Sequence, residues 1–112
     1  MMHDPTVQER ARIIELNDRL RTTFTGGRVQ LRVGTHCLDA QIRGRALYAL
    51  SKYKRFAPDD EHDFGYFTFA GFHFEWQIDY RSADGRARSQ NPADPNGTLR
   101  ILTLYVVSDI LP

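Results

Sequence analysis

The fold class is decided by one stretch of the chain, Phe72-His73-Phe74-Glu75-Trp76-Gln77-Ile78-Asp79-Tyr80. Every second side chain in it is apolar, and a β-strand points successive side chains to opposite faces of its sheet. The stretch therefore predicts a strand with one buried face and one solvent-exposed face. Ala70-Gly71, just before it, has the composition of a two-residue turn, and the aromatic residues that precede this turn form a second run. We predict a β-hairpin over residues 62–80.

The hairpin register follows from matching apolar residues to apolar residues, because a slip by one residue would send every side chain to the other face. The glycine that this register places opposite Trp76 leaves room for the indole. The pairs predicted are Phe69–Phe72, Phe67–Phe74 and Gly65–Trp76 on the buried face, and Tyr66–Glu75 and His62–Asp79 on the other face.

Two helices are predicted outside the hairpin. Residues 6–24 repeat apolar side chains at helical spacing, and Thr6 followed by Glu9 has the spacing of a capping box. Gly26-Gly27 follows this helix, and we expect these glycines to provide its left-handed C-terminal cap. A second helix is expected over residues 38–55.

Two further strands complete the predicted sheet. Residues 28–33 alternate apolar and polar side chains, whereas residues 98–107 are apolar on both faces and predict a central strand. A last strand of this kind could instead lie at an edge and pair with a second copy. Residues 81–97 are rich in turn formers and predict a long loop. The order α-β-α-β-β-β indicates an α+β fold with two helices packed on a four-stranded mixed or antiparallel sheet.

Composition limits the classes of function. The 112 residues suffice for one domain, residues 1–112, with residues 1–5 as an N-terminal tail. Lys and Arg number 15 against 14 Asp and Glu, so there is no overall basic excess of the kind that nucleic-acid binders show. The single cysteine, Cys37, excludes an intrachain disulfide and fits a reducing compartment. No signal peptide or membrane span is apparent, so we expect a cytoplasmic protein without a cofactor.

Several strings along the chain resemble one bacterial family, that of domain of unknown function 3768. The most specific of them is Glu61-His62-Asp63-Phe64-Gly65. The others are Leu16-Asn17-Asp18-Arg19, Thr25-Gly26-Gly27-Arg28, Trp76 with Ile78-Asp79-Tyr80, Pro92-Ala93-Asp94-Pro95 and Arg100-Ile101-Leu102-Thr103. The resemblance implies no catalytic residues. Because such proteins are often encoded on plasmids and integrative elements, it implies an accessory role in mobile-element life, such as interference with a host defence complex.

One candidate constellation for catalysis is His62, Asp63 and Asp79. An imidazole oriented by a carboxylate is a common general base, and the set would suit a small metal-dependent hydrolase. The structural alternative is a cross-strand hydrogen-bonded pair of His62 and Asp79 that fixes register. Cys37, beside His36, is interpreted as a small hydrophobic residue and not as a nucleophile. We favour the structural interpretation for both, which leaves no catalytic and no metal-binding residue.

Basic residues form the second candidate surface. Arg43 and Lys54 flank the apolar stripe of the second predicted helix, and Arg81, Arg86 and Arg88 belong to the long loop. If helix and loop lay on the same side, they would form a surface for a nucleic-acid backbone.

The third candidate surface is the outer face of the hairpin. There Phe64 and Tyr66 are expected to lie exposed beside His62 and Asp79 as a binding patch. Our leading interpretation is a small non-enzymatic module that docks on a macromolecule, preferably a host protein or protein complex. It uses this patch together with the loop arginines, and it acts as a monomer or homodimer.

Overall fold

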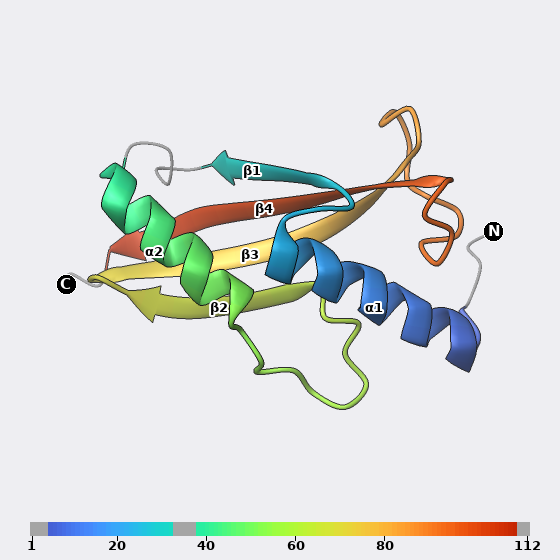
Figure 1. Ribbon diagram of the computed structural model, residues 1–112, viewed down its shortest axis with the longest axis horizontal. Coiled ribbons are helices and arrows are strands. Elements are labelled where there is room, and N and C mark those ends of the chain that lie inside the picture. The colour runs from blue at the N-terminus through green and yellow to red at the C-terminus, as the bar shows by residue number, and fades with distance from the viewer. Residues whose placement is uncertain (1–4, 33–37, 110–112) are drawn as a thin grey trace.

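A four-stranded sheet carries two helices on one of its faces (Figure 1). The computed structural model describes residues 5–32 and 38–109. The elements in chain order are α1 (Val7–Thr23), β1 (Arg28–Arg32), α2 (Ala40–Ser51), β2 (Phe64–Phe69), β3 (Phe72–Ser82) and β4 (Thr98–Asp109). The predicted α+β class is confirmed, with its element order. Val33, at the end of the first predicted strand, and Cys37 lie outside the described residues.

The sheet is mixed. Its strand order is β1-β4-β3-β2, with β1 parallel to β4 and the other neighbours antiparallel. β4 is paired on both sides, as its fully apolar pattern predicted. The alternative that placed this strand at an edge is wrong, and the edges are β1 and β2.

The hairpin has the predicted turn and most of the predicted register. Ala70 and Gly71 both have positive φ, 54° and 84°, which is the geometry of a tight two-residue turn. Gly65 lies opposite Trp76, and Tyr66 lies opposite Glu75. The His62–Asp79 pair is wrong, because β2 begins only at Phe64 and His62, at φ 61°, turns the chain out of the sheet.

The first helix begins as predicted and ends differently. The Glu9 N–H donates to Thr6 Oγ1 (3.0 Å), and the Thr6 N–H donates to Glu9 Oε1 (2.9 Å). The left-handed cap is Phe24 (φ 58°) and not a glycine, so that prediction is wrong. Gly27 is needed for another reason, because a Cβ there would lie 2.6 Å from the carbonyl oxygen of Arg100.

The second helix is shorter than predicted. It begins after Asp39, whose carboxylate accepts from the Gln41 N–H (2.8 Å), and it ends at Ser51. Lys54 therefore lies in the following connection and not on the helix. The chain leaves the helix here because the rings of Tyr53 and Phe56 pack edge-on against Trp76, with centroids 5.5 Å and 6.1 Å away.

The core lies between the helices and the sheet. α1 and α2 contribute Leu20, Ala46 and Leu50, and the strands contribute Phe74, Trp76, Ile78, Leu102 and Leu104. Because β3 alternates, its side chains between these buried ones, Glu75, Gln77 and Asp79, lie on the face that carries no helix.

Candidate binding site

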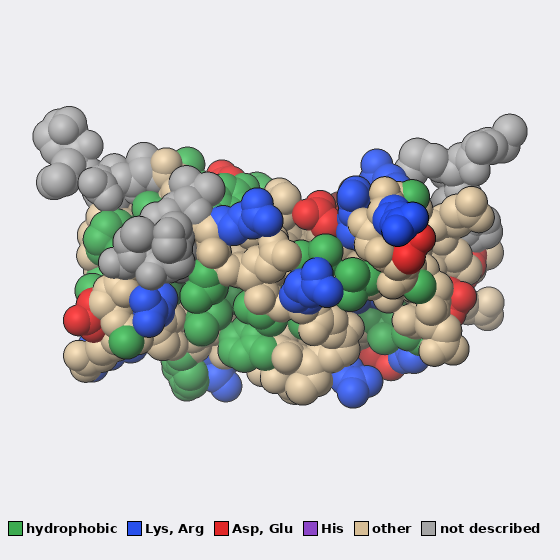
Figure 2. Space-filling view, turned by 90° about the horizontal axis from the view of Figure 1, so that it is seen from above, with side chains coloured by type: hydrophobic (Ala, Val, Ile, Leu, Met, Phe, Trp, Pro, Cys, Tyr) green, Lys and Arg blue, Asp and Glu red, His purple; other side chains and the backbone are tan. Residues whose placement is uncertain are grey.

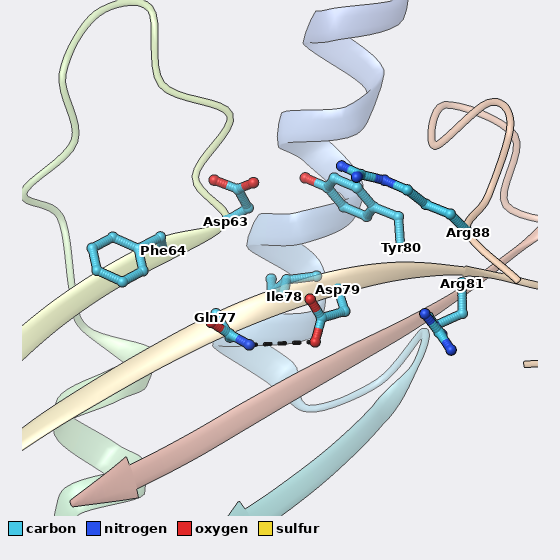
Figure 3. A pocket seen from close by; sticks show the side chains of 8 residues that line it. All are labelled: Asp63, Phe64, Gln77, Ile78, Asp79, Tyr80, Arg81 and Arg88. Atoms are coloured by element: carbon cyan, nitrogen blue, oxygen red, sulfur yellow. Dashed lines mark hydrogen bonds between the residues drawn. The ribbon is translucent and has the colours of Figure 1, made fainter. Parts of the chain in front are cut away.

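A pocket opens where β3 continues past the start of β2. The Ile78 N–H donates to the carbonyl oxygen of Asp63 (2.7 Å), just before β2. Farther along β3, the loop between β3 and β4 takes the place of a neighbouring strand, since the Ser89 N–H donates to Tyr80 O (2.9 Å). Between these two points lies a pocket of about 340 Å³. Figure 3 shows its lining residues, Asp63, Phe64, Gln77, Ile78, Asp79, Tyr80, Arg81 and Arg88.

Four residues predicted to form the binding site meet in this pocket, namely Phe64, Asp79, Arg81 and Arg88. Arg81 lies within β3, so its assignment to the loop is wrong, and it pairs through an isolated backbone bridge with Arg88. In Figure 3, Arg88 reaches from the loop toward Tyr80 and Asp63. Asp79 instead accepts a long hydrogen bond from the Gln77 amide (3.4 Å).

The arginine side chains around the pocket are available to a ligand. Arg81 and Arg88 are exposed, and neither guanidinium makes a hydrogen bond or ion pair within the described part of the chain. Arg86 is equally exposed and unpaired there, but it lies outside the pocket lining. The pocket lining therefore includes two cations that bond no described residue, together with the exposed ring of Phe64, which is 45% accessible.

Burial changes the pKa of two groups that line the pocket, Asp63 and Tyr80, which we call its inner wall. Loss of solvent, together with the charge of Glu61, raises the pKa of Asp63 above its usual range, and Asp60 adds to this. Burial also raises the pKa of Tyr80, although the hydrogen bond from Asn17 opposes the shift. Tyr80 is thus a neutral hydroxyl at physiological pH, and ionised Asp63 is held at a cost in stability.

Replacing Asp63 with asparagine is expected to raise the melting temperature at pH 7. The pKa of Asp63 is higher in the folded than in the unfolded chain, so its ionised form opposes folding. The penalty shrinks as pH falls through the folded pKa and vanishes below the ordinary value of 3.8. Thermal melts of both proteins at pH 7 and pH 3 should show a gain of about 2 °C at pH 7 that largely disappears at pH 3. A variant that melts lower than the wild type at pH 7 would contradict this assignment.

A buried polar network supports the inner wall. Asn17 Nδ2 donates to Tyr80 Oη (2.7 Å) and to Glu61 O (3.0 Å), and its Oδ1 accepts from Arg100 Nε (2.8 Å). Arg100 is only 2% exposed, donates to Pro92 O, and lies over the Tyr80 ring, 5.2 Å from its centroid. Through these bonds α1 and β4 contact the α2–β2 connection at Glu61 and the β3–β4 loop at Pro92.

Sequence reasoning missed Asn17 and Arg100, although a signal for each was present. Asn17 is spaced four residues after Ile13 and three before Leu20, so it falls on the buried stripe of α1. Arg100 lies two and four positions before the buried Leu102 and Leu104, so it falls on the same face of β4. A polar residue at a core position is the informative exception to the hydrophobic pattern.

His62 belongs to a different cluster from Asp79. Its ring stacks on Phe56 with centroids 3.8 Å apart, and its Nδ1 lies 2.9 Å from Asp18 Oδ1, which also accepts from Arg21 (3.0 Å). Asp79 is exposed on the helix-free face. Among the described residues, no group of three His, Cys, Asp or Glu side chains could hold a metal ion. The hydrolase interpretation from His62, Asp63 and Asp79 therefore lacks the geometry that it needs.

The basic residues do not form the combined surface that the nucleic-acid interpretation needs. α2 and the β3–β4 loop lie toward opposite ends of the long axis of the molecule (Figure 1). Arg43 is half-buried and donates to Leu38 O (2.8 Å). In Figure 2, some Lys and Arg side chains lie close together toward the right end, and other groups separate them from the remaining ones, so they form no continuous basic surface on the visible side.

The outer hairpin face does expose its aromatic residues. Tyr66 is 62% accessible and lies on the same face as Phe64. His62, predicted to join them, lies on the helix side against α1. The exposed patch therefore consists of β2 aromatic rings beside the pocket, without the imidazole.

Neither helix that the structure describes has the length and hydropathy needed to cross a membrane. No curated protein and no solved structure matches the chain. The model of one family matches residues 32–109, which include both strands of the hairpin, β4 and every residue of the pocket. The chain belongs to this family, described as protein of unknown function (DUF3768).

Proposed function

We propose that this chain is a non-catalytic module that binds a protein partner at the pocket between β2 and the β3–β4 loop. The observation that carries the proposal is that one pocket is lined by the exposed guanidinium groups of Arg81 and Arg88, which bond no described residue, and by the exposed ring of Phe64. Arginine and aromatic residues dominate the binding energy of protein interfaces. An exposed side chain that bonds no described residue also loses none of these contacts when a partner binds it.

The acidic residues of the pocket favour a protein over a nucleic acid. Asp63 and Asp79 lie in the same lining as the two arginines and would repel a phosphate backbone. The formal net charge of +1 supplies no long-range attraction for phosphate. A protein surface that presents an acidic side chain to the arginines and a donor to the carboxylates would complement all four groups.

The partner that we propose is a protein of the bacterial host. The resemblance to a family that occurs on mobile elements supports this choice, with a defence complex as one example. The surface of this partner would carry at least one carboxylate for the arginines and an apolar group that covers Phe64.

The test compares a variant that removes the two arginines of the pocket lining with a variant that removes one nearby arginine outside it. Tagged wild type, Arg81→Ala/Arg88→Ala and Arg86→Ala are incubated with bacterial lysate, half of which is treated with nuclease, and captured proteins are quantified by mass spectrometry. A partner identified in this way is then purified for titration. The double variant should bind it at least tenfold more weakly, since an arginine at an interface centre contributes about 2 kcal/mol or more. Arg86→Ala should bind like the wild type.

All three proteins should melt at nearly the same temperature, because these side chains make no bonds within the described chain. Equal binding by the double variant and the wild type would remove the assignment. Capture that depends on intact nucleic acid would instead revive the nucleic-acid interpretation.

A further inference from the structure

The two edges of the sheet differ in a way that points to self-association. β1 carries Arg28 and Arg32, and charged side chains on an edge strand oppose pairing with another chain. β2, which reads Phe-Gly-Tyr-Phe-Thr-Phe, has no charge and no proline. Among the described strands it pairs only with β3, and Figure 1 shows it at the margin of the sheet. An uncharged strand with one open edge is a template for another strand.

The backbone groups at this edge can be identified. In an antiparallel pair, residues alternate between hydrogen-bonded and non-hydrogen-bonded positions. Because the Ile78 N–H donates to Asp63 O, the odd-numbered residues of β2 bond to β3. The N–H and C=O groups of Phe64, Tyr66 and Thr68 therefore point to the open edge, and no backbone hydrogen bond elsewhere in the described chain involves them.

We propose that two copies of this chain pair through β2, antiparallel, with Tyr66 opposite Tyr66 of the second copy. This register places Phe64 opposite Thr68, so all three outward residues fall into hydrogen-bonded pairs that exchange both N–H···O bonds. The two-fold axis stands perpendicular to the sheet, and both pairs of helices remain on one face of a continuous sheet.

Side chains on the helix-free face favour this register. On the helix face it brings Phe67 of one copy opposite Gly65 of the other, and the space over Gly65 is already filled by Trp76 and Tyr53 of its own copy. On the other face, the exposed rings of Tyr66 from the two copies meet, and aromatic pairs directly opposite each other stabilise a sheet. Because β2 has no charged side chain, a second uncharged β2 strand complements it better than a charged edge strand of another protein would.

Charge exchange at residue 66 tests the pairing. The proteins are wild type, Tyr66→Lys, Tyr66→Glu and the matched control Tyr48→Lys, which alters a residue of similar exposure, 66%, on α2. Light scattering and sedimentation up to high micromolar concentration measure their masses. Wild type and Tyr48→Lys should be dimers. Each residue 66 variant alone should be monomeric, because like charges would lie opposite each other at the interface.

An equimolar mixture of Tyr66→Lys and Tyr66→Glu should regain the dimer mass, because opposite charges then face each other. This recovery also shows that both variants remain folded, and circular dichroism of each provides a second check. A monomeric wild type would overturn the proposal, as would dimers of both single variants. A mixture that stays monomeric while both variants are folded would overturn the register. None of these results tests partner binding through Arg81 and Arg88, which lie outside β2, and Phe64 is the one residue that the two proposals share.

Discussion

Replacing Asn17 with alanine should lower the free energy of unfolding by about 3–5 kcal/mol, because it leaves the buried Arg100 guanidinium without its side-chain acceptor. The Asn17 amide makes three hydrogen bonds in an interior that excludes water from it entirely. Loss of the amide also removes the donor to Tyr80 and to the Glu61 carbonyl. A buried charge that loses one of its acceptors costs more than the net value of one exposed hydrogen bond.

Urea denaturation followed by circular dichroism measures this loss. Gln8→Ala, an exposed change on the same helix, is the matched control and should remain within about 0.5 kcal/mol of the wild type. The double variant Asn17→Ala/Arg100→Met should recover part of the loss, since it removes the charge together with its acceptor. A loss below about 1 kcal/mol for Asn17→Ala would show that water or another group satisfies Arg100.

Replacing Gly65 with alanine should destabilise the chain by about 2–4 kcal/mol through overpacking. A Cβ at Gly65 would lie 2.6 Å from Trp76 Nε1 and 2.6 Å from Tyr53 Cζ. Both rings are held by neighbours, since the centroid of Tyr53 is 5.1 Å from that of Phe56 and 5.5 Å from that of Trp76. The added methyl group therefore displaces packed aromatic rings and not a flexible side-chain end.

Gly44→Ala is the control for this change. Gly44 lies inside α2 with open space around the position of a Cβ, so alanine there should stabilise the helix by about 0.5–1 kcal/mol. If the free energy of unfolding falls for Gly65→Ala and rises for Gly44→Ala, the steric effect at Gly65 is distinguished from the general effect of glycine on backbone entropy. A Gly65→Ala variant as stable as Gly44→Ala would show that Trp76 and Tyr53 do not approach Gly65 this closely.

Local sequence patterns were enough to predict the parts of the fold that local rules govern. The period-two pattern over residues 72–80 and the Ala70-Gly71 turn were sufficient for the hairpin and its register, because a slip would expose every core side chain. Thr6 and Glu9 determined the start of α1 through bonds across one turn. The apolar faces of residues 98–107 determined that β4 is central. In each case the interacting residues lie within a few positions of one another, or the pattern repeats along a single helix or strand.

The geometry of the candidate site depends on how elements distant in the chain pack together. Where β2 begins, and hence where the pocket opens, depends on His62 leaving the sheet to meet Asp18, which is 44 positions earlier in the chain. The separation of the basic residues depends on the placement of α2 relative to the β3–β4 loop, which no local pattern encodes (Figure 1). The Asn17–Arg100 contact joins residues 83 positions apart. Sequence periodicity reports which side of an element is buried, but the partner of a buried polar group depends on how separate elements pack, and that is settled only when the whole chain is folded.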